Sequence, residues 1–388
     1  MIKNKILKIL NPEKGIRGMR PWIRTVVIIS LLLLISFSCK PEDRREADNR
    51  ITIAIINPSI KSLEGINSLV ENEILNIPEL QLIAVCYAAA ERDFIPVKNY
   101  IKNDDEGLFR FEKIEGELNP DNLYENNSLS NHFHRLFSQT DGIIFLGGAD
   151  ISPAVYDEKT RLVTNITTPY RHYFELSFLF HLIGGSQNEA HIPYLEENPD
   201  YAVIGFCLGM QTMNVASGGS MYQDIPSEIY GLHYVEDVLS LEPNNIHRNY
   251  WQDLWPDDNM VTANFHQITR IRNHSFFDEF LWKENPTPYV YSSHHQALNK
   301  YGKNIEVIAT SIDGKVPEII AHGMFNNVFG VQFHPEKPGL YLNGSEPMTW
   351  HPKDSLHKSY HDFLKEHNSF SFHRYFWKNV NQLFTVKN

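Results

Sequence analysis

Short runs of Ile, Val and Leu recur along this 388-residue chain and constrain its fold more than any other feature. Runs that are apolar at consecutive positions are typical of strands buried on both faces. These runs lie at 51–56, 80–87, 141–148, 201–206, 305–310, 318–321 and 328–333. Helical spacing of apolar residues appears between several of them, around 63–70, 133–137 and 173–183. The alternation predicts an α/β fold of three layers, with a mostly parallel central sheet and helices on both faces.

Three stretches fall outside this pattern. The stretch from Asn99 to Asn127 is polar and acidic, so we expect it to lie at the periphery of the fold. The stretch from Tyr234 to Asn264 is rich in Trp, Asn and Asp and matches no motif, so the sequence leaves its role open. The tail from Ser355 to Phe384 has interleaved aromatic residues and is predicted to be helical.

The N-terminus has the order of a secretory signal. Seven basic residues precede the apolar run Val26–Ile35, which is short for a transmembrane helix of about 20 residues. The run ends on Ser36-Phe37-Ser38-Cys39 and a polar segment follows, which resembles a bacterial lipoprotein signal that is cleaved so that Cys39 becomes the lipidated first residue. A plain signal peptide or an uncleaved anchor is the alternative.

This interpretation divides the chain into three parts. We expect a lipoprotein-type signal at 1–38, a polar tether at 39–50, and a folded domain with a helical tail at 51–388. Export and a membrane anchor through the lipid on Cys39 follow. The chain has a formal net charge of −12, and the part beyond residue 38 carries −18, because residues 1–38 hold seven basic residues and one acidic residue. This negative net charge argues against binding to nucleic acid, because the phosphate backbone is also negatively charged.

The chain has three cysteines, Cys39, Cys86 and Cys207. So few cysteines in an exported protein do not form a disulfide scaffold. Cys86 lies in an apolar strand-like run and is predicted to be a core residue. A disulfide between Cys86 and Cys207 stays open at this point, and it would exclude a catalytic role for Cys207.

Cys207 lies at a predicted turn from strand to helix, in Gly205-Phe206-Cys207-Leu208-Gly209. Glycines two residues before and after it allow the backbone to turn sharply beneath the side chain, as in a nucleophile elbow. The N-terminus of the following helix also favours a thiolate over a thiol. The alternative is a buried structural cysteine between two turn glycines.

A cysteine nucleophile needs a base, a residue that orients the base, and N–H donors for an oxyanion. His334 follows a buried-type strand directly, and Glu336 lies two residues further on. The N–H groups of Leu208 and of the Gly147-Gly148 turn are candidates for the oxyanion donors. Because the carboxyl ends of parallel strands meet at one edge of a sheet, we expect these groups to converge.

Several motifs resemble one known superfamily. Residues 205–211 and 330–336 look like the corresponding motifs of the class I glutamine amidotransferase superfamily. Residues 141–156, 214–225 and 292–297 resemble those of the bacterial gamma-glutamyl-gamma-aminobutyrate hydrolases within it. The motifs follow the family's order over most of residues 51 to 345.

The resemblance implies a Cys-His-Glu triad at Cys207, His334 and Glu336 and a pocket for a gamma-glutamyl group. It also implies that His295 lines this pocket beside the triad, with a packing role as the alternative. Gln211, one helical turn from Cys207, either reaches the glutamyl part of the substrate or caps the turn.

The match departs from the bacterial branch at several positions. That branch usually has Arg where Leu208 stands. Leu208, the Asp313-Gly314-Lys315 turn and residues 334–338 look more like the folate-type gamma-glutamyl hydrolases. The amine released from the substrate is therefore left open.

The 18 histidines raise the question of a metal site. His294-His295 and the helical pair His357 and His361 are the obvious candidates, but no cysteine or carboxylate joins them at ligand spacing. We expect no metal and no cofactor.

Together these features predict an exported, membrane-tethered thiol hydrolase of the omega-peptidase type. It would cleave gamma-glutamyl amide bonds of a small substrate through a thioester on Cys207. One alternative is a glutaminase-type component of a glutamine amidotransferase. Another is a non-catalytic lipoprotein that binds gamma-glutamyl ligands. The oligomeric state is not determined by the sequence.

Overall fold

The computed structural model describes residues 50–90, 94–104, 107–254, 260–342, 349 and 359–385. The predicted signal at 1–38, Cys39 and the tether up to residue 49 lie outside the described residues. The described residues belong to one compact unit that begins at Arg50. A search of them finds no helix with both the length and the apolar character needed to cross a bilayer.

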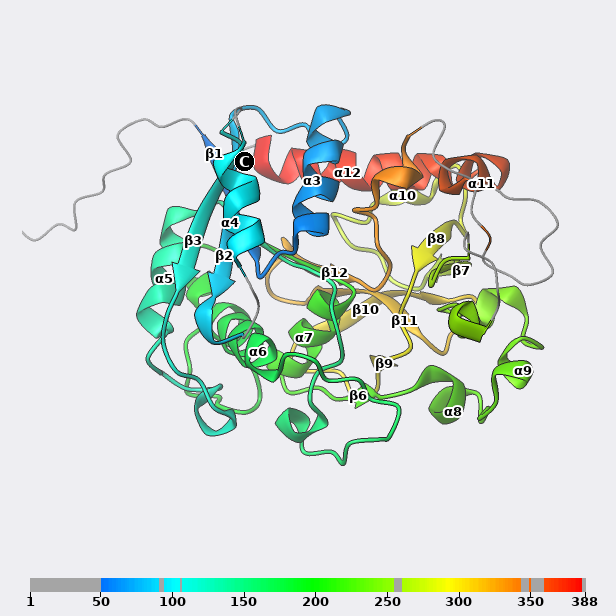
Figure 1. The fold of residues 1–388 in the computed structure, drawn as a ribbon, viewed down its shortest axis with the longest axis horizontal. Helices are drawn as coiled ribbons and strands as arrows, with labels where there is room; N and C mark the ends of the chain where they lie inside the picture. The colour runs from blue at the N-terminus through cyan, green and yellow to red at the C-terminus, as the bar shows by residue number, and fades with distance from the viewer. Residues whose placement is uncertain are drawn as a thin grey trace, which may run out of the picture. The chain divides into compact units, whose positions relative to one another are not determined.

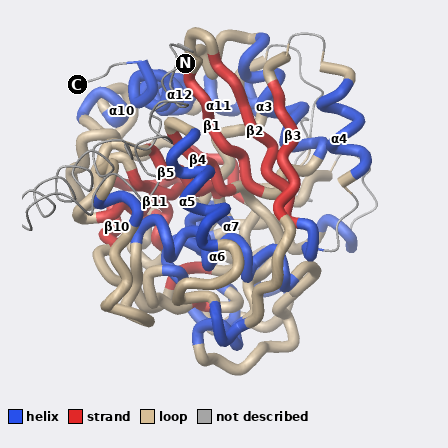
Figure 2. The backbone as a smooth tube through the Cα atoms, turned by 90° about the vertical axis from the view of Figure 1, so that its left-hand side faces the viewer, coloured by secondary structure: helices blue, strands red, loops and turns tan. Residues whose placement is uncertain are grey.

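One sheet organises the described residues (Figures 1 and 2). Its ten strands follow the order β3-β2-β1-β4-β5-β12-β11-β10-β7-β8. The strands are β1 (Ile51–Ile56), β2 (Leu80–Tyr87), β3 (Phe109–Ile114), β4 (Gly142–Phe145), β5 (Ala202–Phe206), β7 (Asn264–Arg270), β8 (Tyr289–Ser292), β10 (Ile305–Ser311), β11 (Pro317–His322) and β12 (Val328–Val331). The six strands from β3 to β12 are parallel, and the other four pair antiparallel. The predicted α/β fold with a mostly parallel sheet is confirmed.

Helices cover both faces of the sheet, as Figure 1 shows. One face carries α3 (Ile60–Glu71), α4 (Ile95–Lys102), α10 (Glu279–Trp282), α11 (Tyr360–Glu366) and α12 (Phe370–Thr385). The other carries α5 (Ser130–Gln139), α6 (Pro169–Ile183) and α7 (Leu208–Ala216). The buried side chains of the two groups belong to separate hydrophobic clusters, one on each side of the sheet.

The strands supply both clusters by alternation. In β1, Ile53 and Ile55 pack with α3, whereas Ala54 and Ile56 pack with α6 and α7. Successive side chains of a strand point to opposite faces, so a strand buried on both faces has to be apolar at every position. This explains the continuous apolar runs in the sequence.

Shorter elements connect the main ones. They are β6 (Met221–Tyr222) and β9 (Ala297–Leu298), which form a two-stranded sheet, the helices α8 (Ile225–Ile229) and α9 (Val235–Val238), and the 3-10 helices η1 (Ala88–Ala90), η2 (Pro120–Asn122), η3 (Pro153–Tyr156), η4 (Tyr194–Glu196), η5 (Pro243–Asn245), η6 (Gln252–Leu254) and η7 (Pro338–Leu340). Residues 231–254, called the 231–254 segment below, contain α9, η5 and η6.

The sheet contains three strands that the sequence did not reveal. The polar stretch 99–127, predicted to lie at the periphery, contains the edge strand β3, which extends the sheet beside β2. β3 lies at the edge of the sheet, and only its two end residues are buried. Its middle residues are mostly polar, so the sequence shows no apolar run at this strand. The sequence also did not reveal β7 and β8. The tail is helical as predicted, in α11 and α12.

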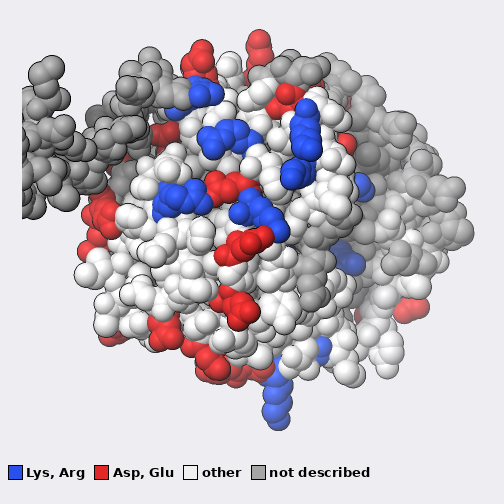
Figure 3. All heavy atoms as spheres, turned by 60° about the vertical axis from the view of Figure 1, so that its left-hand side comes forward, with Lys and Arg blue, Asp and Glu red and all other residues white. Residues whose placement is uncertain are grey.

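The surface charges are mixed in sign. On the face shown in Figure 3, basic and acidic side chains lie interspersed. One pair of this kind joins Arg135 of α5 to Glu112 of the edge strand β3. The expectation that the protein does not bind nucleic acid stays a prediction.

Two helical glycines provide a test of the packing of α7 on the sheet. A Cβ atom on Gly209 would overlap the backbone carbonyl of Phe145 in β4, whereas one on Gly65 in α3 would meet its nearest atom at 3.7 Å. We expect Gly209→Ala to lower the free energy of unfolding by about 1–3 kcal/mol. We expect Gly65→Ala to leave it unchanged or raise it by up to about 1 kcal/mol. Denaturant unfolding of both variants measures the difference, and equal effects would contradict the close approach of α7 to β4.

Candidate active site

Three neighbouring parallel strands, β4, β5 and β12, end at the same edge of the sheet. The chain leaving β4 contains Gly147 and Gly148, Cys207 directly follows β5, and His334 lies three residues after β12. A Cβ atom placed on Gly147 would lie 2.8 Å from Cε1 of His334 and 3.6 Å from Cβ of Cys207. The structure therefore brings the predicted nucleophile, base and glycine turn together, although about sixty residues or more separate them in sequence.

Cys207 adopts a strained conformation between β5 and α7. Its φ of 50° and ψ of −101° are unusual for a residue with a side chain. The backbone N–H of Cys207 donates to the carbonyl of Val331 at 2.8 Å, which holds the turn against β12. A Cβ on Gly205 would lie 2.6 Å from the carbonyl carbon of Gly209, so the turn requires glycine there. The result is a sharp elbow that places a buried thiol at the N-terminus of α7.

His334 and Glu336 form a buried pair beside this thiol. Nδ1 of His334 lies 2.7 Å from Oε1 of Glu336. Burial alone would lower the pKa of His334, but the negative charges of Glu336 and Cys207 raise it to about 10. Burial would likewise raise the pKa of Glu336, but the charge of His334 outweighs it and lowers this pKa. The arrangement stabilises an imidazolium ion beside the carboxylate of Glu336.

Gln332 is a neighbour of the thiol that the sequence did not identify. Its Nε2 donates to Sγ of Cys207 at 3.5 Å. Nε2 of Gln211 in turn donates to Oε1 of Gln332 at 3.2 Å. Both roles predicted for Gln211, a contact with substrate and capping of the turn, stay predictions. Gln332 lies two residues before His334. Because every second residue of a strand points to the same face, the prediction that His334 faces the thiol could have been extended to Gln332.

A buried ion pair holds the glycine turn in place. Nη2 of Arg171 donates to the carbonyls of Leu146 and Gly147, each at 3.2 Å. Nε of Arg171 donates to Oε1 of Glu175 at 2.7 Å, and both residues lie on α6. Asn57, directly after β1, donates to the same carboxylate oxygen at 3.1 Å. In the sequence, Arg171 and Glu175 have the spacing of an ordinary helical surface pair, which conceals this role.

His295 lies between two carboxylates. Its Nε2 is 3.0 Å from both oxygens of Asp150, and its Nδ1 is 3.6 Å from Asp224. Burial alone would lower the pKa of His295, but hydrogen bonds to the two carboxylates raise it to about 9. Asp150 lies two residues after Gly148, so His295 is tied to the chain that leaves the glycine turn. Its role as a pocket-lining residue stays a prediction.

A hollow of about 570 Å³ is bordered by Asp224, one of the two carboxylates that contact His295. The 231–254 segment supplies much of its wall, including Leu232, Tyr234 and Tyr250. The stretch 234–264, whose role the sequence left open, therefore contributes to a concave surface next to the histidine–carboxylate contacts.

Two remaining questions from the sequence concern cysteine and histidine. Cys86 lies fully buried in β2 and forms no disulfide with Cys207, which removes the obstacle to a catalytic thiol. His361 is buried on α11, and its helical partner His357 lies outside the described residues.

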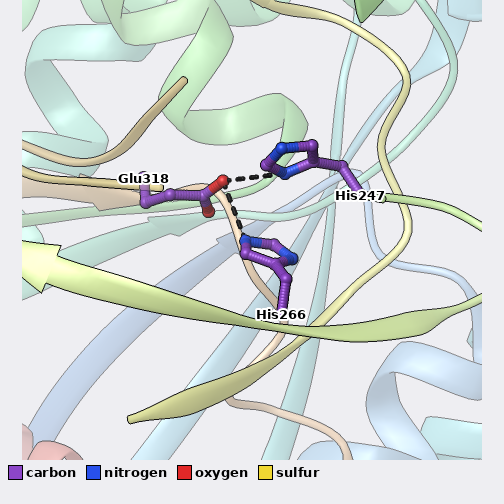
Figure 4. Close-up of side chains that lie close together, drawn as sticks. All are labelled: His247, His266 and Glu318. Carbon is purple, nitrogen blue, oxygen red and sulfur yellow. Dashed lines mark ion pairs between the residues drawn. The ribbon is translucent and has the colours of Figure 1, made fainter. Parts of the chain in front are cut away.

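A second group of buried polar side chains lies around Glu318, whose carbonyl accepts from the backbone N–H of Gln332 at 2.8 Å. His247, His266 and Glu318 place one potential ligand atom each within 4.8 Å of one another, a spacing that could hold a metal ion (Figure 4). His294 also reaches Glu318, at 3.6 Å from Nε2 to Oε1. The residues of this group are spread over the sequence from 247 to 318, so local ligand spacing gave no signal of it.

Comparison with known proteins places this geometry in context. The family model described as Peptidase C26 matches residues 125–336, which include Cys207, His334 and Glu336. Protein NtpR of Enterococcus hirae is 30% identical over 199 residues, which cover 51% of this chain and 67% of that protein. The glutamine amidotransferase-like protein YvdE of Lactococcus lactis subsp. lactis is 26% identical over 200 residues, covering 50% of this chain and 66% of YvdE. The chain thus spans about two thirds of the length of these relatives.

A solved structure is also similar. It is that of a Thermoplasma acidophilum protein described as belonging to a GMP synthase. The two structures align over 85% of this chain and 94% of the other, at 10% identity and a TM-score of 0.37.

The raised pKa of His334 predicts how its contribution to stability depends on pH. Between its ordinary pKa of 6.5 and about 10, the folded state binds more protons at this site than the unfolded state. The contribution is therefore complete below about pH 6.5 and is lost as the pH rises through about 10. We expect the difference in free energy of unfolding between wild type and His334→Gln to shrink over this range.

His373→Gln is the matched control for this measurement. Burial lowers the pKa of His373 to about 4, so that ring is neutral in both states once the pH is about one unit above its ordinary pKa of 6.5. The corresponding difference for His373→Gln should stay level from about pH 7.5 to 10. A level difference for His334→Gln as well would show that the His334 charge is not stabilised by its neighbours.

Proposed function

The chain belongs to the Peptidase C26 family, and from this we propose that it is a cysteine hydrolase that cleaves gamma-glutamyl amide bonds. The observation that carries the proposal is the strained elbow of Cys207 beside the His334–Glu336 pair. A buried thiol next to an imidazolium ion is the arrangement that activates sulfur as a nucleophile.

The proposed reaction has two steps. The Cys207 thiolate attacks the side-chain amide carbon of the gamma-glutamyl group, and the N–H groups of Leu208 and Gly148 stabilise the resulting oxyanion. His334 gives its proton to the departing amine as the carbon–nitrogen bond breaks, which leaves a thioester. Water then loses a proton to His334 and attacks the thioester, so that the carboxylic acid leaves and the thiolate returns.

The surrounding side chains support this chemistry because they hold the reacting groups in position. Glu336 holds the ring of His334 through Nδ1, which leaves Nε2 for the thiol and the leaving amine. Gln332, held by Gln211, contacts the sulfur from another side. Arg171 binds the carbonyls of Leu146 and Gly147 and so positions the Gly148 N–H. Each of these groups is placed before substrate arrives, which lowers the cost of reorganisation.

The leaving-group side of the substrate is assigned to the region around His295. The positive charge of His295 between Asp150 and Asp224, and the hollow beside Asp224, provide room and polarity for a group larger than ammonia. A bulky amine or an amino acid is therefore the expected leaving group.

A second candidate is favoured by the names of the relatives, several of which are called glutamine amidotransferase-like. A glutaminase component of an amidotransferase would release ammonia from glutamine for a partner synthase. The two candidates share the triad and differ in the leaving group and in the need for a partner.

The proposed location is the cell envelope. Seven basic residues, the apolar run Val26–Ile35 and Cys39 support cleavage of a lipoprotein signal and a lipid anchor. This proposal favours the hydrolase, because ammonia released outside the cytoplasm would diffuse away from any synthase inside it.

Replacement of the nucleophile tests the triad. We expect Cys207→Ala to lower turnover by about 10⁴-fold or more while changing the melting temperature by only a few degrees. Cys86→Ala, which removes the buried thiol of β2, should keep its activity. In the wild type, iodoacetamide should label Cys207 faster than Cys86, because a thiolate reacts faster than a buried thiol. Activity in Cys207→Ala, or faster labelling of Cys86, would remove Cys207 from the mechanism.

A comparison of substrates separates the two candidate functions. We expect the full chain in detergent, without partner or nucleotide, to cleave a gamma-glutamyl anilide or a gamma-glutamyl amino acid. Its kcat/KM for these compounds should exceed that for free glutamine by about tenfold or more, because the hollow accepts a larger leaving group. Turnover of glutamine alone, or turnover only after a synthase is added, would favour the amidotransferase.

A further inference from the structure

Four buried side chains outside the triad meet around one carboxylate: Glu318 of β11, His266 of β7, His294 after β8, and His247 of the 231–254 segment. We call these four residues the histidine–glutamate cluster. Three of its members are drawn in Figure 4, where both rings face the carboxylate. The cluster joins a segment outside the sheet to two of its strands.

The distances within the cluster match the needs of a metal ion. Oε1 of Glu318 lies 3.1 Å from Nδ1 of His247 and 3.0 Å from Nε2 of His266. It lies 3.6 Å from Nε2 of His294. Ligand atoms bound tetrahedrally to Zn²⁺ at about 2.0–2.1 Å are about 3.3 Å apart. The cluster therefore needs only small side-chain shifts to surround such an ion.

Burial makes the cluster costly without an ion. Each of the four residues is at most 3% exposed. Within the described part of the chain, neither oxygen of Glu318 makes a hydrogen bond of acceptable geometry, and the same is true of both ring nitrogens of His247 and of His266. Buried carboxylates and imidazoles nearly always have partners, because burying them unpaired opposes folding. A bound dication would satisfy the carboxylate and the ring lone pairs at once.

An ion pair alone accounts for the arrangement less well. One protonated histidine would neutralise Glu318, but three rings surround the carboxylate. The lone pairs of the other two rings, which are neutral, would then remain buried without a hydrogen-bond donor. A metal ion accepts electron pairs from all of them.

The ring of His294 is already held as metal ligands usually are. Its Nδ1 lies 2.8 Å from the backbone carbonyl of Gln296, and since a carbonyl only accepts, Nδ1 carries the proton. The lone pair of Nε2 then faces Glu318. Fixing of a histidine tautomer by a backbone carbonyl is a regular feature of metal sites.

We propose that the histidine–glutamate cluster binds one structural Zn²⁺ ion that fastens the 231–254 segment to the sheet. Three imidazoles and one carboxylate fill a tetrahedral site and leave no position for substrate, which separates this ion from the thiol chemistry. His247 brings the segment to the ion, and Leu232, Tyr234 and Tyr250 of the same segment line the hollow next to Asp224. The ion would thus fix one wall of that hollow. This inference departs from the expectation of no metal, and it does not depend on the proposed activity.

Metal content is the direct test. The full chain, purified in detergent without chelator and with a tag free of histidine, should contain about one zinc per chain by elemental analysis. Removal of the zinc by a chelator should lower the melting temperature by about 5 °C or more, and added Zn²⁺ should restore it. Co²⁺ in place of zinc should give the intense visible absorption of a tetrahedral site. A wild-type chain that takes up less than about 0.1 zinc after dialysis against Zn²⁺, with a melting temperature insensitive to chelator, would overturn the proposal.

Variants locate the ion. His266→Gln and Glu318→Gln each remove one ligand and should lower bound zinc about tenfold or more. His322→Gln is the matched control, because His322 is a buried histidine on the same strand as Glu318 but outside the cluster. It should keep its zinc. His294→Gln should change the cobalt spectrum, since it removes the fourth ligand. Full zinc in His266→Gln, or equal loss in His322→Gln, would place the metal elsewhere.

Discussion

The close approach of α7 to the sheet is the constraint on which the site depends. Gly209 in the first turn of α7 lies directly against the carbonyl of Phe145, so the helix can start immediately at the end of β5. That start forces Cys207 into its positive φ and places its thiol at the helix N-terminus. Without this contact between two backbones, α7 would lie further from the sheet, and the sulfur would no longer face His334.

Burial of charge is the second determinant of the site. His334 is held as a cation because Glu336 and Cys207 flank it, and Glu336 stays ionised because His334 is next to it. Each group would become neutral if it were buried alone. The Arg171–Glu175 pair is likewise buried, and its carboxylate also accepts a hydrogen bond from Asn57. These charges stabilise one another only in the folded arrangement, which couples the protonation of the site to its geometry.

The histidine–glutamate cluster differs from the triad in how its charge is balanced. In the triad, nitrogen and oxygen atoms meet in an aligned hydrogen bond of 2.7 Å. In the cluster, three rings surround one carboxylate oxygen at similar distances without such alignment. The first geometry suits transfer of a proton, and the second suits a shared cation. A zinc ion there would let the wall beside Asp224 vary in sequence while its position stays fixed.

The sequence by itself determined the apolar strands of the sheet and the ends of its central strands, because a strand buried on both faces has to be apolar throughout. It also singled out Cys207, His334 and Glu336, because their signals are local in sequence: glycines flank Cys207 in the turn, and His334 and Glu336 are two residues apart. Only the tertiary structure decided which distant residues meet. The edge strand β3, the contact of Gln332 with sulfur and the cluster around Glu318 were hidden for one physical reason. Their polar side chains meet residues far away in sequence, and such contacts leave no periodic trace along the chain.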